Sequence, residues 1–160
     1  MDPLRVVLLI HVVAGVVGLV AALPATRSAK RRGLHTRSGR VFAVCGLVVA
    51  ASALALVAAR PSELVGLGVL GVLTGVWSGA GWWLAASRPA VPGGWLYWHI
   101  QMMGSGVIAF VTAFAVTLAD GHLVAWILPT IIGSALIGRA LSRPGRAWRP
   151  RRQTPSPTRA

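Results

Sequence analysis

Residues 41–59 read VFAVCGLVVAASALALVAA, an apolar run that contains no charged side chain. As an α-helix rising 1.5 Å per residue, this run is about 28 Å long, close to the roughly 30 Å hydrocarbon core of a bilayer. Inside hydrocarbon a chain must satisfy its own backbone hydrogen bonds, and a helix does so within one segment. The run therefore predicts a membrane-spanning helix.

Four more apolar runs flank this one, at 6–25, 65–86, 100–119 and 123–138. The first three of them are also long enough to cross the hydrocarbon core. The fourth is only about 24 Å long and contains Pro129, so it spans only if Arg139 extends toward the interface.

Composition excludes a water-soluble globule, because 55% of the 160 residues are apolar and only 12% are charged. Soluble domains carry roughly 25% charged residues. We predict an all-α bundle of about five transmembrane spans over residues 1–141. Residues 142–160 are rich in Pro, Arg, Ser and Thr and predict a basic disordered cytoplasmic tail.

The charges predict the orientation of this bundle. The chain has 16 basic and three acidic residues, a net charge of +13. Most of the basic residues lie in segment 26–40, at Arg88 and from Arg139 onward, all on one side of the membrane. The three acids lie on the other side: Asp2, Glu63 and Asp120. The positive-inside rule then places the N-terminus outside and the C-terminus in the cytoplasm of a bacterial inner membrane.

The basic side predicts attraction to anionic lipid headgroups, worth about 1 kcal/mol per basic residue near the surface. No recognition helix, zinc finger or RNA-binding motif accompanies the charge, so we expect no nucleic-acid partner. Glycines at 71, 75 and 79 form a doubled GxxxG pattern, which favours close helix packing within one chain. A homo-oligomer built on the same pattern stays open.

Ionisable groups in a membrane are functional candidates, and here they are histidines. His11 lies in the first span near its outer edge, and His99 lies at the start of the fourth span near the cytoplasmic edge. About 20 Å of depth separates them, so they should not share one metal. His35 falls near the level of His99, and His122 near that of His11. For His11, a hydrogen bond to a neighbouring helix competes with a ligand or proton-relay role.

Three interpretations of the cytoplasmic histidines stay open. In the first, His35 and His99 tie the first loop to the fourth helix by hydrogen bonds. In the second, His99 ligates copper or haem b with Met103, which follows it by four residues, or with His35. In the third, a pocket for an anionic headgroup or substrate is formed by a larger set: His35, Arg37, Arg40 and Gln101.

Five segments of the chain carry a family resemblance: 9–15 (LIHVVAG), 30–42 (KRRGLHTRSGRVF), 99–105 (HIQMMGS), 112–114 (TAF) and 126–133 (WILPTIIG). Together, and in this order, they resemble a bacterial family of integral membrane proteins known as domain of unknown function 2306. Its pattern includes an LHI-like start and a K-G-x-x-x-H-R-x-x-G-R-x-[YF] loop. The resemblance covers about residues 5 to 140.

Two departures stand out, because Gly106 replaces a tyrosine of the family pattern and Thr36 replaces a basic residue. The resemblance implies a helical membrane bundle and brings no established activity. It also implies that the family's recurrent polar positions fall on the following residues: His11, His35, Arg37, Arg40, His99 and Met103.

The sequence lacks paired carboxylates, a G-x-x-x-x-G-K phosphate loop, a C-x-x-C pair and an H-E-x-x-H motif, so we expect no enzyme of the known hydrolase or nucleotide-dependent classes. Three hypotheses follow. The first is a non-enzymatic membrane binding or scaffold protein. The second is a haem- or copper-binding redox component, and the third is a small transporter subunit.

Overall fold

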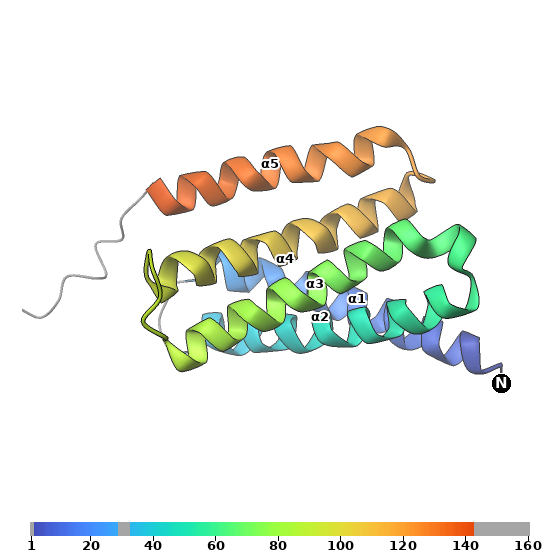
Figure 1. Cartoon of the computed structure of the whole chain (residues 1–160), viewed down its shortest axis with the longest axis horizontal. Helices are drawn as coiled ribbons and strands as arrows, with labels where there is room; N and C mark the ends of the chain where they lie inside the picture. Colours follow the sequence, from blue (N-terminus) through green and yellow to red (C-terminus); the bar gives the residue numbers. More distant parts are fainter. Residues whose placement is uncertain (1, 29–32, 143–160) are drawn as a thin grey trace, which may run out of the picture.

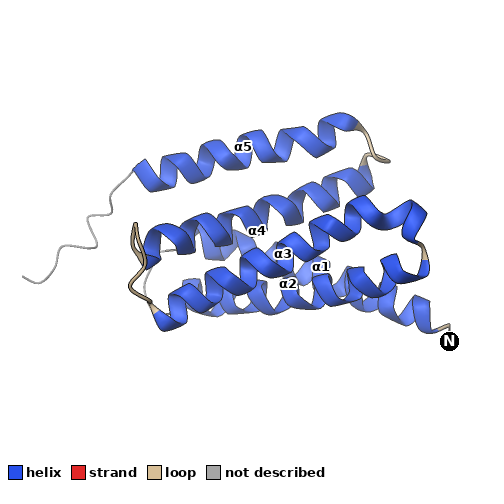
Figure 2. Ribbon diagram, in the orientation of Figure 1, coloured by secondary structure: helices blue, strands red, loops and turns tan. Residues whose placement is uncertain are grey.

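The structure is a computed structural model that describes residues 2–28 and 33–142. Five helices account for nearly all of them, and this part of the chain contains no strand (Figure 2). The helices are α1 (Pro3–Arg27), α2 (Leu34–Ala59), α3 (Pro61–Ser87), α4 (Trp95–Leu118) and α5 (Leu123–Ser142). All five are long and apolar enough to cross a membrane, which confirms the predicted all-α bundle. The tail predicted after Ser142 lies outside the described residues.

The helices are longer than the apolar runs that predicted them, mainly at polar ends. α2 begins at Leu34 instead of residue 41, and α4 begins at Trp95 instead of residue 100. His99 is therefore the fifth residue of α4, not its opening residue. Apolar runs mark only the part of a helix in hydrocarbon, whereas the backbone ladder continues through the interface.

Local signals set several helix ends. Asp2 caps α1 through its side chain, which accepts a hydrogen bond from the Leu4 amide, and Pro3 follows at the first helical position. Pro61 is likewise the first residue of α3, which has no side-chain cap. Proline suits this position because the first helical amides have no intrahelical acceptor. The connection between α3 and α4 turns through Gly93 and Gly94, whose φ angles of 80° and 83° favour glycine.

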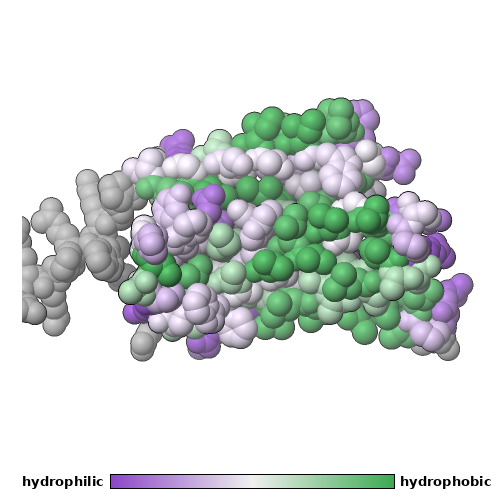
Figure 3. All heavy atoms as spheres, viewed as in Figure 1, coloured by the Kyte–Doolittle hydropathy of each residue, from purple (hydrophilic) through white to green (hydrophobic). Residues whose placement is uncertain are grey.

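Helices α1 to α4 form a four-helix group in which each helix packs on the next, and α1 also touches α4 (Figure 1). α5 lies outside this group and packs mainly on α4, and none of its residues is buried. The flank of the molecule is apolar and the polar residues collect at its two ends (Figure 3), as a membrane-spanning bundle requires.

The core of the four-helix group is built from small residues around two aromatic rings. Phe42 of α2 and Phe110 of α4 lie across the bundle from each other, with ring centroids 5.7 Å apart. On the α2–α3 interface, Gly71 and Gly75 face Ala53 and Ala50. Lipid tails are as apolar as leucine, so tight backbone approach through small residues, not burial from water, holds these helices together.

Gly75 and Gly79 provide a matched test of this packing. A Cβ at Gly75 would lie 2.5 Å from the Ala50 Cβ and 3.3 Å from the Gly46 carbonyl oxygen, whereas one at Gly79 would lie 3.5 Å from Leu47. We expect Gly75→Ala to lower the free energy of unfolding in mixed detergent micelles by about 1–3 kcal/mol through overpacking. Gly79→Ala should leave it within about 1 kcal/mol of the wild type. Equal effects of the two changes would contradict the interface.

Candidate functional site

The two ends of the bundle differ in charge. Five of the seven described arginines gather where α1, α3 and α5 end and where α2 and α4 begin: Arg27, Arg37, Arg40, Arg88 and Arg139. We call this the basic end; it is on the left in Figure 1. Asp2, Glu63 and Asp120 lie at the opposite end, beside the N-terminus and the α2–α3 and α4–α5 turns.

His35 and His99 meet at the basic end. Their ring centroids are 6.4 Å apart, and the ring planes stand at 81° in an edge-to-face contact. His35 lies in the first turn of α2, and His99 lies in the second turn of α4. These helices occupy diagonal positions in the four-helix group, so the two half-buried rings come together between them. The sequence placed both residues at one level, and the structure also places them in contact.

The orientation of the His35 ring is set by α1. Its Nδ1 lies 2.7 Å from the Ala25 carbonyl oxygen. A carbonyl only accepts, so Nδ1 carries the hydrogen and the neutral ring has its lone pair on Nε2. Ala25 belongs to the last turn of α1, where carbonyls have no intrahelical donor. His35 thus caps α1 and links it to α2.

The orientation of the His99 ring is set by α3 in the same way. Its Nδ1 lies 2.8 Å from the Gly81 carbonyl oxygen and donates to it. Gly81 is buried, and a side chain there would collide with Met103, which packs against its Cα face. The absence of a side chain at Gly81 therefore lets α4 approach α3 closely enough for this hydrogen bond.

A second layer of rings extends from His99 toward the surface. The Trp95 ring lies 6.4 Å from the His99 ring, at 49°. The Arg88 guanidinium lies 5.2 Å above Trp95 in a cation–π contact. Arg88 ends α3 in the left-handed conformation, with φ of 48°. One continuous series of contacts therefore joins an exposed cation to the two histidines.

The other residues predicted at this site differ from the histidine pair in packing and exposure. Met103 packs against Gly81 and the central cluster around Phe42 and Phe110, in the position of a core side chain. Gln101 is half-buried two residues beyond His99. Arg37 and Arg40 are exposed, whereas His35 points into the bundle. A residue two positions along a helix is rotated by about 200°, so Arg37 and His35 project from different sides of α2.

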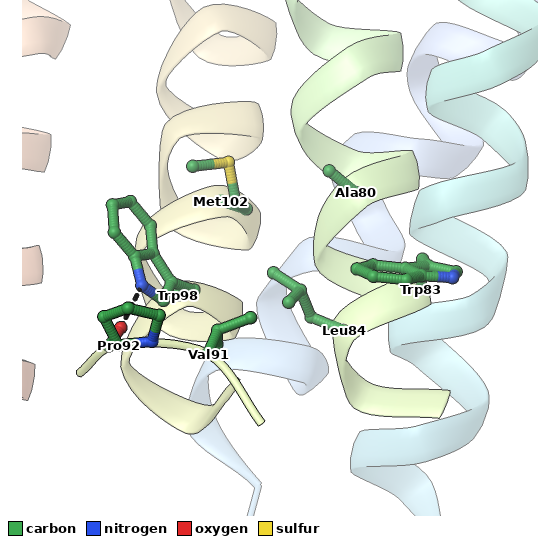
Figure 4. A pocket seen from close by; sticks show the side chains of 7 residues that line it. All are labelled: Ala80, Trp83, Leu84, Val91, Pro92, Trp98 and Met102. Carbon is green, nitrogen blue, oxygen red and sulfur yellow. Dashed lines mark hydrogen bonds between the residues drawn. The ribbon is translucent and has the colours of Figure 1, made fainter. Parts of the chain in front are cut away.

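Met102 faces the outer surface of the bundle. It lines an apolar hollow between α3 and α4 together with Trp83, Leu84, Val91 and Trp98, and with Ala80 and Pro92 (Figure 4). Within the hollow, Nε1 of Trp98 donates to the Pro92 carbonyl oxygen over 2.8 Å. With no other polar contact among its lining side chains, this hollow suits an acyl chain of the surrounding lipid.

His11 is positioned by α2, away from the basic end. Its Nδ1 lies 2.8 Å from Oγ of Ser52. That hydroxyl donates its own hydrogen to the Val48 carbonyl oxygen over 2.7 Å, so His11 is the donor to Ser52. The expected interhelical hydrogen bond of His11 is present. His122 is exposed in the α4–α5 turn, where its Nδ1 accepts from the Val124 amide over 3.3 Å.

Three contributors to these contacts carried no signal in the sequence. The carbonyls of Ala25 and Gly81 are backbone groups, which any residue type supplies, and Ser52 resembles many membrane serines that bond only to their own helix.

Thr112 is buried in α4, 3% exposed, and its Oγ1 has no hydrogen-bond partner in the described part of the chain. Across residues 2–28 and 33–142, no three His, Cys, Asp or Glu side chains form a metal-binding group.

The His11–Ser52 hydrogen bond predicts a measurable coupling between α1 and α2. In a double-mutant cycle of His11→Ala and Ser52→Ala, we expect a coupling free energy of about 0.6–1.7 kcal/mol, the range of interhelical hydrogen bonds in membranes. The cycle would be measured from unfolding in mixed micelles. His122→Ala with Ser52→Ala serves as control and should show no coupling, because His122 does not bond to Ser52. Equal coupling in both cycles would contradict the assignment.

The basic end thus combines an oriented pair of imidazoles with exposed arginines on the outer faces of the same helices. In chemical terms, the imidazoles can donate through Nδ1 and accept or ligate through Nε2, and the guanidinium groups can bind anions. Comparison of the chain with protein families, with curated proteins and with solved structures finds no match.

Proposed function

We propose that the chain is a non-enzymatic multi-pass protein of a bacterial inner membrane whose basic end binds anionic lipid headgroups. We further propose that it belongs to the family known as domain of unknown function 2306. The observation that carries the lipid proposal is the distribution of charge: five of the seven described arginines lie at one end of the bundle, and every described carboxylate side chain lies at the other.

The arginines of the basic end are available to an external anion. Arg27, Arg37, Arg40 and Arg139 are exposed. Between the described side chains, the one ion pair joins Arg60 to Glu63 over 4.0 Å, at the opposite end. Guanidinium groups bind phosphate through two parallel hydrogen bonds, which a carboxylate of the protein would otherwise occupy. Phosphate headgroups of an anionic leaflet meet this requirement.

Aromatic residues support an interfacial position for the basic end. Trp82, Trp83, Tyr97 and Trp98 are all exposed in the last turns of α3 and the first turn of α4. Indole and phenol rings prefer the headgroup region, where an apolar ring and a polar edge are both accommodated. The arginines then lie at the depth of the lipid phosphates. By the positive-inside rule this leaflet is the cytoplasmic one, with the N-terminus outside and the C-terminus inside.

The orientation can be measured with reporters in cells. A fluorescent protein that matures only in the cytoplasm should fluoresce when fused after Ala160 and stay dark when fused before Met1. Alkaline phosphatase, which is active only outside, should give the reverse pattern. A phosphatase-active fusion at the C-terminus would overturn the orientation, and matching locations of both termini would overturn the odd number of spans.

Lipid binding can be measured through stability. Adding phosphatidylglycerol to the detergent-solubilised protein should raise its unfolding temperature, because a ligand that binds only the folded state stabilises it. We expect the increase to fall by at least half in the double variant Arg37→Gln/Arg40→Gln and in high salt. The matched control Arg5→Gln/Arg60→Gln removes the same charge at the opposite end and should keep the increase. An equal response to zwitterionic lipid would contradict the proposal.

A further inference from the structure

We propose that the hollow between α3 and α4 is a binding site for one anionic phospholipid, whose phosphate contacts Arg88 and whose acyl chain lies along Trp98 and Met102. This site deepens the lipid binding proposed for the basic end and rests on it, because it requires the basic end to lie at the depth of the lipid phosphates. It adds a defined position on the bundle and a defined stoichiometry of one lipid per chain.

The lining of the hollow suits a hydrocarbon chain. Its volume of about 420 Å³ falls within the roughly 300–1,000 Å³ of small-molecule sites. Val91 and Pro92 of the α3–α4 connection line it at the basic end, and Met102 lines it deeper in the bundle (Figure 4). Apart from its two indoles, no lining side chain carries a hydrogen-bond donor, and Nε1 of Trp98 already donates to the Pro92 carbonyl oxygen. The wall is therefore apolar, as an acyl chain requires.

One face of α4 leads from the basic end into the hollow. Trp95, Trp98 and Met102 follow one another at intervals of three and four residues, so they lie on the same side of the helix. The helix rises about 10 Å from Trp95 to Met102, which is two-thirds of the roughly 15 Å of hydrocarbon in one leaflet. A chain along this face therefore runs from the interface toward the middle of the membrane.

Arg88 lies at the interfacial end of this face. Its guanidinium is 5.2 Å above the Trp95 ring, and its backbone amide donates to the carbonyl of Leu84, which lines the hollow. A guanidinium in a cation–π contact keeps N–H groups for the paired hydrogen bonds that a phosphate accepts. Every described carboxylate lies at the opposite end, so none of them competes for these donors.

The backbone of Arg88 supports a role for its side chain. Arg88 ends α3 with φ of 48°, a left-handed conformation that glycine adopts without strain and usually supplies at this helix position. Other residues are uncommon there, and they gather at functional sites. Here the position holds a cation over Trp95 and beside the hollow, which a glycine could not provide.

A second apolar hollow, between α1 and α2, provides a matched comparison. Its volume is about 460 Å³, close to that of the first. It is lined by the following residues: Leu9, Ile10, Val13, Ala14, Val17 and Cys45. No aromatic ring and no loop residue line it, and it begins one helical turn after Arg5, at the end that carries the acids. It therefore offers an apolar groove of equal size without the features of the basic end.

Two changes test the site, and each has a matched control. Arg88→Gln removes the guanidinium, and Ala80→Phe fills the hollow with a ring. Arg27→Gln is the control for charge, because Arg27 is also an exposed arginine where a helix ends at the basic end. Val13→Phe is the control for filling, because Val13 lines the second hollow.

Native mass spectrometry of the detergent-solubilised protein, titrated with phosphatidylglycerol, counts the lipids that each chain retains. The wild type should retain one phosphatidylglycerol before any further lipid binds. The dissociation constant of this lipid should rise about tenfold in Arg88→Gln and in Ala80→Phe, as expected for loss of a charged hydrogen-bond donor or of the acyl groove, and stay within about twofold in both controls. Phosphatidylcholine, whose choline cation would meet the arginines of the basic end, should bind more weakly.

Several results would overturn the single site: no lipid bound more tightly than the rest, an equal effect of Arg88→Gln and Arg27→Gln, or equal retention of phosphatidylcholine. A dimer that Ala80→Phe abolishes would instead assign the hollow to a second copy of the chain. Unfolding temperatures measured without lipid verify that the variants are folded. If Ala80→Phe does not fold, Arg88→Gln and its control decide the outcome alone.

Failure of this site is distinguishable from failure of the proposed function. The double variant Arg37→Gln/Arg40→Gln should lose most of the stabilisation by phosphatidylglycerol and still retain the one tightly bound lipid. Stabilisation that depends on Arg37 and Arg40, without a tightly bound lipid that depends on Arg88, would overturn the site alone. A wild type that phosphatidylglycerol neither stabilises nor binds would overturn both.

Discussion

Hydrocarbon offers no hydrogen bonds, and this single constraint shapes the bundle at every level. It makes each apolar run a helix, because only a helix satisfies its backbone within one segment. It also explains why hydroxyls such as those of Ser38, Thr74 and Ser78 donate to carbonyls one turn back in their own helices. The imidazole rings follow the same rule across helices: each of the three buried or half-buried histidines donates to an acceptor on a neighbouring helix.

Apolar length predicted the number and type of helices well, because the energetic signal of a 20-residue apolar run is large. It placed their polar ends less well. Segment 34–40 contains His35, Arg37 and Arg40 and has no apolar pattern, yet it extends α2 because the interface tolerates charged side chains on a continuing helix. The order and contacts of α1 to α4 required the structure, since any two apolar helices can pack in several ways.

The site was predictable in part. Depth along the spans placed His35 and His99 at one level, and the structure brings their rings together. The depth of a residue in the membrane does not determine which side of its helix the residue occupies. The outward direction of Arg37 and Arg40 was therefore not predictable from depth. The backbone acceptors Ala25 and Gly81 had no signature in the sequence. Orientation, family and ligand stay predictions, because the fold of a bundle is compatible with either orientation and with several chemistries.

The peripheral position of α5 has a consequence for how the protein assembles. Membrane helices form first and associate afterwards, and a chain is synthesised from its N-terminus. Helices α1 to α4 make the central contacts among themselves, whereas α5 packs mainly on α4 and buries no residue. The four-helix group can therefore close, with His35 against His99, while α5 is still emerging from the ribosome. Packing of α5 then adds a helix to a core that is already complete.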